Sequence, residues 1–290
     1  MHRLAPVVLS LLATGAWAQD FLRTVANTTS ENEVCVTWSN RRIVYVIDSA
    51  GSERTPAETE FSAITNSFAT WQVISDSCSD FTFSGGPRQD KLTVGKGTQD
   101  SNGLVFRETL CRDDDPCQAT RTCGNTNRCW DHDDPSTIAL TTVTYSTRTG
   151  IIYDADVEYN ASAFLFTTVA SPPCLPDHES VSCVAYDVQN STTHEIGHMV
   201  GFDHVLNATS TMAPTAVLGD TQKRILDYGT QDGFCSTYPR GQPPVPCDQL
   251  AQIQKRIIAK NTGTFGCSCS ELNGLFPFAL WLLLTRRRRA

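Results

Sequence analysis

The chain has 290 residues, of which 40% are hydrophobic and 19% are charged, so it has enough apolar residues to fold around a core. Its formal net charge is −8, which argues against binding to nucleic acid through a broad basic face. The length allows one domain with extensions or two small domains.

The first residues predict export. A basic start at residues 2–3 precedes an apolar run from Leu4 to Leu12, and Ala16-Trp17-Ala18 supplies a small-residue cleavage pattern before Gln19. The run is too short to span a membrane comfortably, which disfavours an N-terminal anchor helix. We therefore expect a signal peptide at 1–18 and a secreted or cell-surface protein.

Twelve cysteines fit an oxidising compartment. Four of them recur at a regular interval of six residues, namely Cys111, Cys117, Cys123 and Cys129. Structural zinc sites usually hold their cysteines closer together in the sequence, so for this regular group we favour two disulfides over a four-cysteine zinc knot, with the connectivity left open. We expect Cys174 to pair with Cys183. Four more cysteines are expected to pair among themselves, namely Cys35, Cys78, Cys235 and Cys247.

The first half of the chain combines short strands with one long helix. Residues rich in β-branched and aromatic side chains predict strands at 34–38, 43–47 and 81–83. Apolar residues recur at near-helical spacing from Pro56 to Val73, with Thr55 suited to cap the helix. We expect this helix to cover one face of a sheet.

The stretch from Thr98 to Pro135 resembles an inserted loop. Aspartates cluster at 113–115 and again at 131–134, and carboxylates are the ligands that calcium prefers. No spacing typical of an EF-hand is present, so a solvated acidic loop is favoured. Calcium binding is kept as the alternative for these carboxylates.

Two adjacent strands are predicted at 138–145 and 151–160. In the second, Ala155, Val157 and Tyr159 alternate with three carboxylates, which are expected to face the other side. The segment after 187 leads into another helix, with Asp187 as a plausible N-cap.

One stretch of that helix carries chemistry: residues 194–204 read H-E-x-x-H-x-x-G-x-x-H. On a helix, His194 and His198 lie one turn apart on the same face, so both imidazoles can point at one ion. Gly201 permits a positive φ, which lets the chain turn back and bring in His204. Three imidazoles with an open position are typical of catalytic zinc, and the Glu195 carboxylate can reach a water there.

This stretch resembles the long zinc signature of the metzincin metalloproteases. Their methionine turn is matched by residues 210–214, with Met212 as the floor under the metal, and Pro214 favours the matrixin branch over the astacins. The resemblance covers about residues 33–240. It implies an α+β, zincin-like fold: a twisted mixed β-sheet with an antiparallel edge strand, a long covering helix and an active-site helix.

A second run is similar to a D-A-D-I-x-F-N segment of matrixin-like enzymes, in which it forms the antiparallel edge strand above the cleft. The resemblance therefore implies that peptide substrates add to this strand through backbone hydrogen bonds. The residues concerned are Asp156, Val157, Glu158, Tyr159 and Asn160.

The resemblance implies a zinc-dependent endopeptidase acting on protein or peptide substrates. His194, His198 and His204 would hold Zn²⁺, and Glu195 would be the general base. A surface adhesin or binding module with a structural zinc is the alternative, and a zinc amidase acting on non-peptide bonds is a third hypothesis. The intact ligand set and Glu195 favour catalysis.

The C-terminal part predicts a linker and a tail. Three prolines at 241–246 indicate that a linker, 241–265, follows a metalloprotease domain at 19–240. At 266–290 a pair of cysteines precedes a short apolar run and four arginines, Arg286–Arg289. This tail resembles the myxobacterial C-terminal sorting tail (MYXO-CTERM), which implies a membrane-bound sorting protease as partner and transient membrane association. A simple tail anchor is the alternative.

Overall fold

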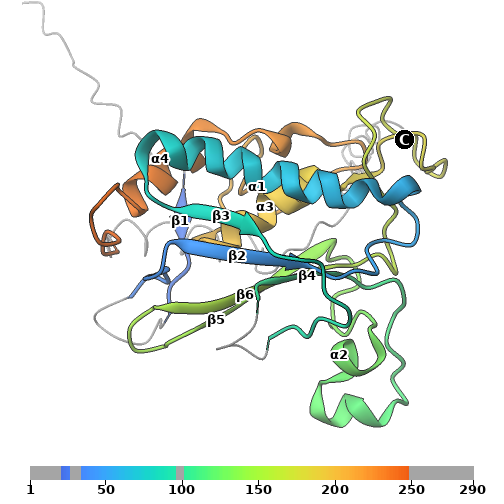
Figure 1. Cartoon of the computed structure of the whole chain (residues 1–290). Helices are drawn as coiled ribbons and strands as arrows, with labels where there is room; N and C mark the ends of the chain where they lie inside the picture. The colour runs from blue at the N-terminus through green and yellow to red at the C-terminus, as the bar shows by residue number, and fades with distance from the viewer. Residues whose placement is uncertain (1–20, 27–33, 96–100, 248–290) are drawn as a thin grey trace, which may run out of the picture.

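The computed structural model describes residues 21–26, 34–95 and 101–247. Its main element is a five-stranded mixed sheet, with helices α1 and α3 on one face (Figure 1). The strand order is β3-β2-β4-β6-β5, in which β2, β3, β4 and β6 run parallel and β5 is antiparallel to β6. Their bounds are β2 Arg42–Ile47, β3 Thr82–Gly85, β4 Gly103–Phe106, β5 Ala139–Tyr145 and β6 Ile152–Tyr159. The predicted mixed sheet with an antiparallel edge strand is confirmed.

Helix α1, Thr59–Cys78, starts three residues later than predicted. The 3-10 turn η1, Pro56–Glu58, precedes it, and Ala57 and Glu58 both have a φ of 55°, which interrupts the helix. Thr55 does not cap the turn with its side chain. Its hydroxyl instead donates to the buried Glu60 carboxylate, which also accepts the Ser52 N–H.

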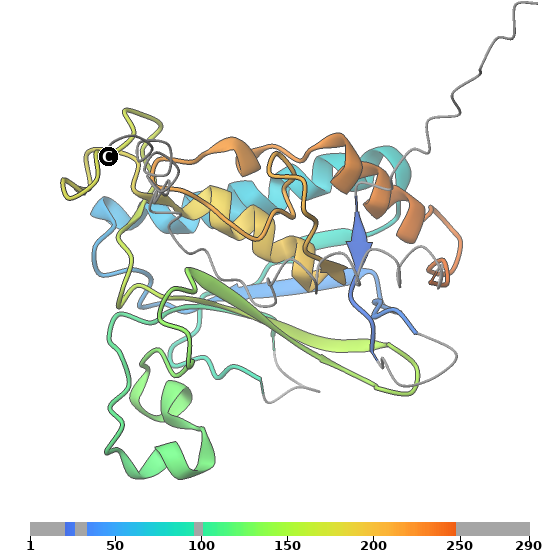
Figure 2. The same cartoon turned by 180° about the vertical axis from the view of Figure 1, so that it is seen from behind.

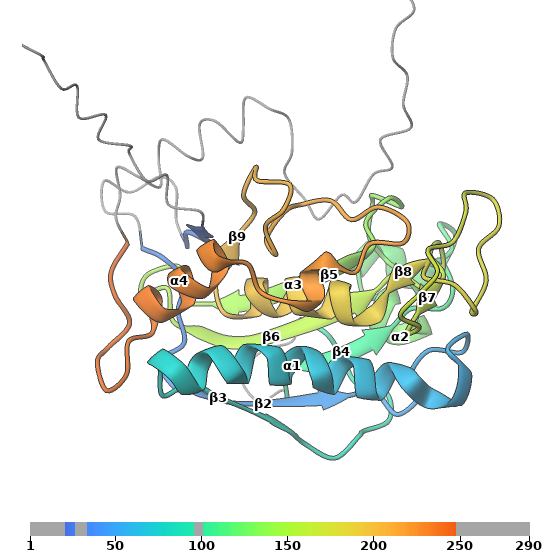
Figure 3. The same ribbon diagram turned by 90° about the horizontal axis from the view of Figure 1, so that it is seen from above.

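Helix α3, Val188–Met199, lies beside α1, as Figure 3 shows from above. The predicted N-cap is confirmed: the Asp187 carboxylate accepts the Asn190 N–H at 2.7 Å. The last helix, α4 Tyr228–Thr237, has an analogous cap at Asp227, and the 3-10 turn η3, Gln222–Arg224, precedes it.

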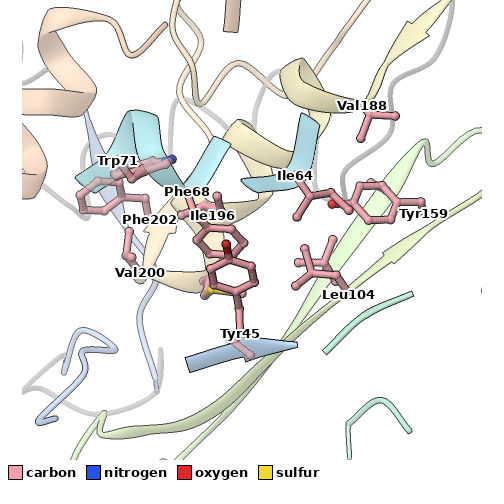
Figure 4. Close-up of a cluster of buried hydrophobic side chains, with 14 of the residues drawn as sticks. Tyr45, Ile64, Phe68, Trp71, Leu104, Tyr159, Val188, Ile196, Val200 and Phe202 are labelled. Carbon is pink, nitrogen blue, oxygen red and sulfur yellow. The ribbon is translucent and has the colours of Figure 1, made fainter. Parts of the chain in front are cut away.

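Between these helices and the sheet lies the main core (Figure 4). Ile196 of α3 and Val200, which directly follows this helix, are fully buried, as are Trp71 and Ile64 of α1. The Trp71 indole donates to the carbonyl of Thr193 at 3.0 Å, so α1 is tied to the turn of α3 that precedes the histidines. The core thereby fixes α3 against the sheet.

Two short pairings complete the body. Strand β1, Leu22–Arg23, is antiparallel to β9, Phe202–Asp203, and β7, Phe166–Thr167, is parallel to β8, Tyr186–Asp187. The strand predicted at 34–38 is not continuous, because only isolated bridges form there, at Cys35 and Thr37.

The placement of the 154–160 run at the sheet edge was wrong. Strand β6 lies between β4 and β5, and the antiparallel edge strand is β5. The chain turns back at 146–151, so β5 pairs with one side of β6 while β4 pairs with the other. Asp156, Val157, Glu158, Tyr159 and Asn160 thus belong to an internal segment and offer no free edge to a peptide.

The three carboxylates on β6 are not exposed to solvent. Asp154, Asp156 and Glu158 are all buried, because another part of the chain covers that face of the sheet. The Glu158 carboxylate accepts from Arg107 Nε at 2.6 Å and lies 2.9 Å from His132 Nε2.

Five disulfides join the ten cysteines that the structure describes, and all three expectations about them are confirmed. The regular group forms nested bridges, Cys111–Cys129 and Cys117–Cys123, around η2, Pro116–Thr120, and α2, Cys123–Asn127. Figures 1 and 2 show this Cys-rich segment on the side of the sheet opposite α1 and α3. The other bridges are Cys35–Cys247, Cys78–Cys235 and Cys174–Cys183. So many disulfides indicate an extracellular environment.

The start of the predicted linker is tied to the body. Besides the bridge at Cys247, the Val245 N–H donates to the carbonyl of Thr237 at 3.0 Å. The signal peptide predicted at 1–18, the rest of the predicted linker and the tail predicted at 266–290 lie outside the described residues. Within the part that is described, no helix has both the length and the apolar composition to cross a membrane.

Candidate metal centre

Three imidazoles from one short stretch of chain meet at a single point. His194 and His198 project from consecutive turns of α3, and their Nε2 atoms lie 3.2 Å apart. The Nε2 atom of His204 lies 3.2 Å from that of His194 and 3.0 Å from that of His198. The predicted ligand residues are therefore brought together by the fold.

The third histidine reaches this point because the chain reverses at Gly201, whose φ is 95°. A Cβ at this position would lie 2.6 Å from the carbonyl oxygen of Val36, so glycine is required by both the backbone angle and the close approach. Strand β9 follows at once and pairs with β1, which fixes the segment that leads to His204.

Hydrogen bonds from the far side of two rings orient the nitrogens that converge. The Nδ1 atom of His194 lies 2.6 Å from the carbonyl oxygen of Thr211, and that of His198 lies 2.9 Å from the carbonyl oxygen of Phe202. A carbonyl only accepts, so each Nδ1 carries the proton and each neutral ring presents a lone pair at Nε2. Lone pairs at 3.2 Å repel unless a cation lies between them, so this donor set fits a metal ion.

The surroundings also favour neutral imidazoles, which is the form that binds metal. Burial is the main cause that holds the pKa of His194 well below its usual range, and the Lys223 ammonium adds to it. Burial likewise lowers the pKa of His204, with His198 as the next cause.

Glu195 lies beside this group and is only 2% exposed. Its carboxylate accepts a hydrogen bond from the Thr141 hydroxyl at 2.7 Å, and Thr141 lies on the edge strand β5. Burial raises the pKa of Glu195, against opposing contributions from His198 and from the Thr141 hydrogen bond. A carboxylate held in this way is suited to accept and return a proton.

Met212 lies directly against α3. It is fully buried, and a Cβ added to Gly197 would lie 2.2 Å from its sulfur, so the helix has a glycine where the methionine packs. The carbonyl of Met212 also accepts the Val205 N–H at 3.0 Å, which joins the turn to the segment that carries His204.

The cap residue of α4 holds this turn in place. The Asp227 carboxylate accepts the Thr211 N–H at 2.6 Å, the Ser210 hydroxyl at 3.0 Å and the Thr230 hydroxyl at 2.6 Å. Burial acts to raise the pKa of Asp227, but these hydrogen bonds outweigh it and the pKa is lowered. Because Thr211 supplies the carbonyl that orients His194, Asp227 also acts on the metal centre.

Of the five residues expected to bind substrate from the edge strand, none joins the histidine group. Tyr159 instead supports α3 from the sheet, since its hydroxyl lies 2.7 Å from that of Thr192. The sequence analysis missed Thr141 and Asp227, whose roles depend on pairing across long separations. Only the capping position of Asp227 before a helix left a local signal.

A second group with metal-ligand chemistry lies in the Cys-rich segment, where Asp115 lies close to Cys117 and Cys123. These two cysteines are joined in a disulfide, so their sulfurs are not available as thiolate ligands.

Comparison with known proteins adds no assignment: no protein-family model matches the chain, and no curated protein matches it. The interpretation of the site therefore depends on its own geometry and chemistry.

Proposed function

We propose that the protein is an exported, zinc-dependent endopeptidase of the metzincin class, in its matrixin-like branch. The observation that carries the proposal is the convergence of three imidazole Nε2 atoms, 3.0–3.2 Å apart, beside the buried Glu195 carboxylate. The methionine that packs under the helix, Met212, adds support because it occupies the place expected from the sequence motif.

His194, His198 and His204 would hold the zinc. Zinc–nitrogen bonds of about 2.0–2.1 Å at tetrahedral angles separate nitrogens by roughly 3.3 Å, close to the separations found here. Bound zinc supplies Lewis acidity, which activates a water and polarises the scissile carbonyl.

The remaining steps belong to side chains of this chain. Glu195 takes the proton of the attacking water and delivers it to the leaving amine. Thr141 donates to Oε2 of Glu195 and so fixes the direction in which the carboxylate points. No covalent intermediate with the protein is needed, because the water attacks directly.

The edge strand β5 is the surface on which we expect an extended peptide to bind. Among the described residues β5 pairs with β6 alone, so its outer edge can add a further strand through backbone hydrogen bonds. Thr141 of this strand touches Glu195, which brings a peptide bound along β5 close to the base.

Export and surface sorting complete the proposal. The signal peptide at 1–18 and the sorting tail at 266–290 rest on the sequence, and the five disulfides are consistent with an extracellular destination. A membrane-bound sorting protease would process the tail.

The test is zinc content and casein cleavage in the purified protein, compared with Glu195→Gln. We expect about one zinc per chain in both, with activity reduced by about 10²–10⁴ in the variant. Glu179→Gln, at an exposed glutamate, serves as the matched control and should retain activity. Zinc in every protein without cleavage by any would favour the alternative, a binding module with a structural metal.

A further inference from the structure

A narrow cavity lies between the proposed general base and the strand on which we expect a peptide to bind. His194 and Glu195 of the metal centre form one part of its wall. Ile138 and Ala139, where β5 begins, form another part. Thr141, two residues further along β5, donates to Glu195. The cavity therefore lies beside the residues of a bound peptide that flank the scissile bond.

This cavity is small. Its volume is about 10 Å³, which is the space of about one water molecule, and a methyl group has a similar size. Its wall reaches the surface at Ala216, a half-buried residue followed by Val217, which is 63% exposed. A peptide side chain can approach from there, but only a very short one fits inside.

Lys223 closes the buried side of the cavity. It lines the wall and is only 2% exposed. Its ammonium donates to the carbonyl of Ala213 at 2.6 Å, and its backbone N–H donates to Asn190 Oδ1 at 2.7 Å. Both bonds are made within the protein, so Lys223 is a fixed wall here and not a partner for a substrate group.

The wall that the sheet provides is fixed as well. Ala139 pairs with Tyr159 of β6, and the carbonyl of Ile138 accepts the Asn160 N–H at 2.8 Å. Close-packed surroundings of this kind resist the insertion of additional methylene groups, because neighbouring side chains and backbone would have to shift.

We infer that the protein cleaves bonds whose amine side is a residue with a very small side chain, namely alanine, serine or glycine, and that Lys223 and Ala216 set this limit. The inference rests on the proposed peptidase function and names the substrate class of that site. The amine side is specified because Glu195, which lines the cavity, delivers the proton to the leaving amine. A methyl group fills the cavity, whereas leucine exceeds it.

The experiment uses the zinc-loaded protein and peptides that differ only in the residue on the amine side of the scissile bond, which is Gly, Ala, Ser, Leu or Phe. Mass spectrometry of the products identifies the bond that is cleaved. For the wild type we expect kcat/KM to be at least about tenfold higher for Ala than for Leu. The same substitutions on the carbonyl side should give a smaller ratio, because that side chain does not enter this cavity.

Two variants change the wall in opposite directions. Lys223→Ala removes the closing side chain, so the Ala-to-Leu ratio should fall to about one. Ala216→Val narrows the cavity, so the ratio of Ala to Gly should fall. Ratios are compared because the Lys223 charge also acts on His194 and Glu195, and its loss changes the cleavage of every peptide by the same factor. The matched controls, Lys91→Ala and Ala69→Val at exposed positions, should leave both ratios unchanged.

A wild-type protein that cleaves the Leu and Ala peptides equally well would overturn the inference, whether or not the variants fold, and would mean that the cavity holds only water. An Ala-to-Leu ratio that Lys223→Ala leaves unaltered would overturn the role given to Lys223. Neither result would affect the proposed function, because both require cleavage. Failure to cleave any peptide would instead remove the peptidase proposal and the inference with it.

Discussion

The protein buries two polar clusters, and they differ in how their groups are satisfied. On β6 the carboxylates meet donors from other parts of the chain, such as Arg107 Nε at 2.6 Å from Glu158. At the end of α3, three imidazole Nε2 atoms converge at 3.0–3.2 Å from one another. The first cluster contains oppositely charged partners, whereas the second brings together three groups of the same kind that could hold a metal ion, and this is how a candidate ligand site differs from a buried ion-pair network.

Substitutions in the two clusters should therefore have different effects. Changes in the β6 cluster should alter the free energy of unfolding and leave zinc binding intact. Changes around Glu195 should alter activity and leave the fold intact.

The largest expected effect is that of Arg107→Met. Arg107 is fully buried, so its loss leaves the Glu158 carboxylate buried with only His132 as an ionisable partner. Breaking a buried pair from one side costs about 3–5 kcal/mol of unfolding free energy. Urea denaturation measures this loss, and zinc content at a low urea concentration should match that of the wild type. A variant as stable as the wild type would contradict the structural role of this cluster.

Gly197→Ala should cost about 1–3 kcal/mol of unfolding free energy, since the new methyl group would overlap the sulfur of Met212. The displacement occurs at the metal centre, so activity should also fall. Thermal unfolding and casein cleavage measure the two effects. The matched control is Gly241→Ala, because Gly241 has nothing within 4 Å of an added Cβ, although its φ of 67° adds a small cost. Unchanged stability and activity in Gly197→Ala would show that the methionine does not press on the helix.

The β6 cluster also predicts a dependence of stability on pH. Burial, together with the neighbouring Asp154, raises the pKa of Asp156 to about 8. A carboxyl whose pKa is raised on folding stabilises the fold fully below its unfolded pKa of about 4, and this contribution is lost as the pH rises through 8. Asp154→Asn removes the like charge and should reduce the loss of stability between pH 5 and pH 8. Denaturation of the zinc-loaded protein at these two pH values tests this, and identical pH dependence in both proteins would contradict it.

The smallest effect concerns the hydroxyl that orients the base. Thr141→Val keeps the shape of the side chain and removes the hydrogen bond to Glu195, and we expect kcat to fall by about tenfold with little change in KM. Thr141→Ser restores the hydroxyl and should recover most of the activity. If serine fails to rescue, the methyl group rather than the hydrogen bond is what matters at this position.

The sequence predicted the metal centre better than it predicted its surroundings, and the reason is distance along the chain. His194, His198 and His204 lie within eleven residues, so helical periodicity and one glycine turn suffice to bring them together. Thr141 reaches Glu195 across 54 residues, which depends on where β5 lies in the sheet. No local sequence pattern encodes the order of strands in a sheet. For the same reason, the 154–160 run was wrongly placed at the sheet edge.

Helix α1 shows a smaller failure of the same kind. Its apolar periodicity was visible, but it starts only at Thr59, because the positive φ of Ala57 and Glu58 interrupts the helix before that residue. The Thr55 hydroxyl donates to Glu60 and accepts no N–H from the first turn.

The central claim is that three histidines and no others hold the metal, and zinc stoichiometry of histidine variants tests it most directly. We expect about one zinc per chain in the wild type and in His132→Ala, in which a histidine of the β6 cluster is removed. His204→Ala should contain none after dialysis against a weak chelator, because two imidazoles from one helix bind zinc far less tightly than three. Equal zinc in His204→Ala and the wild type, or loss of zinc in His132→Ala alone, would contradict the account.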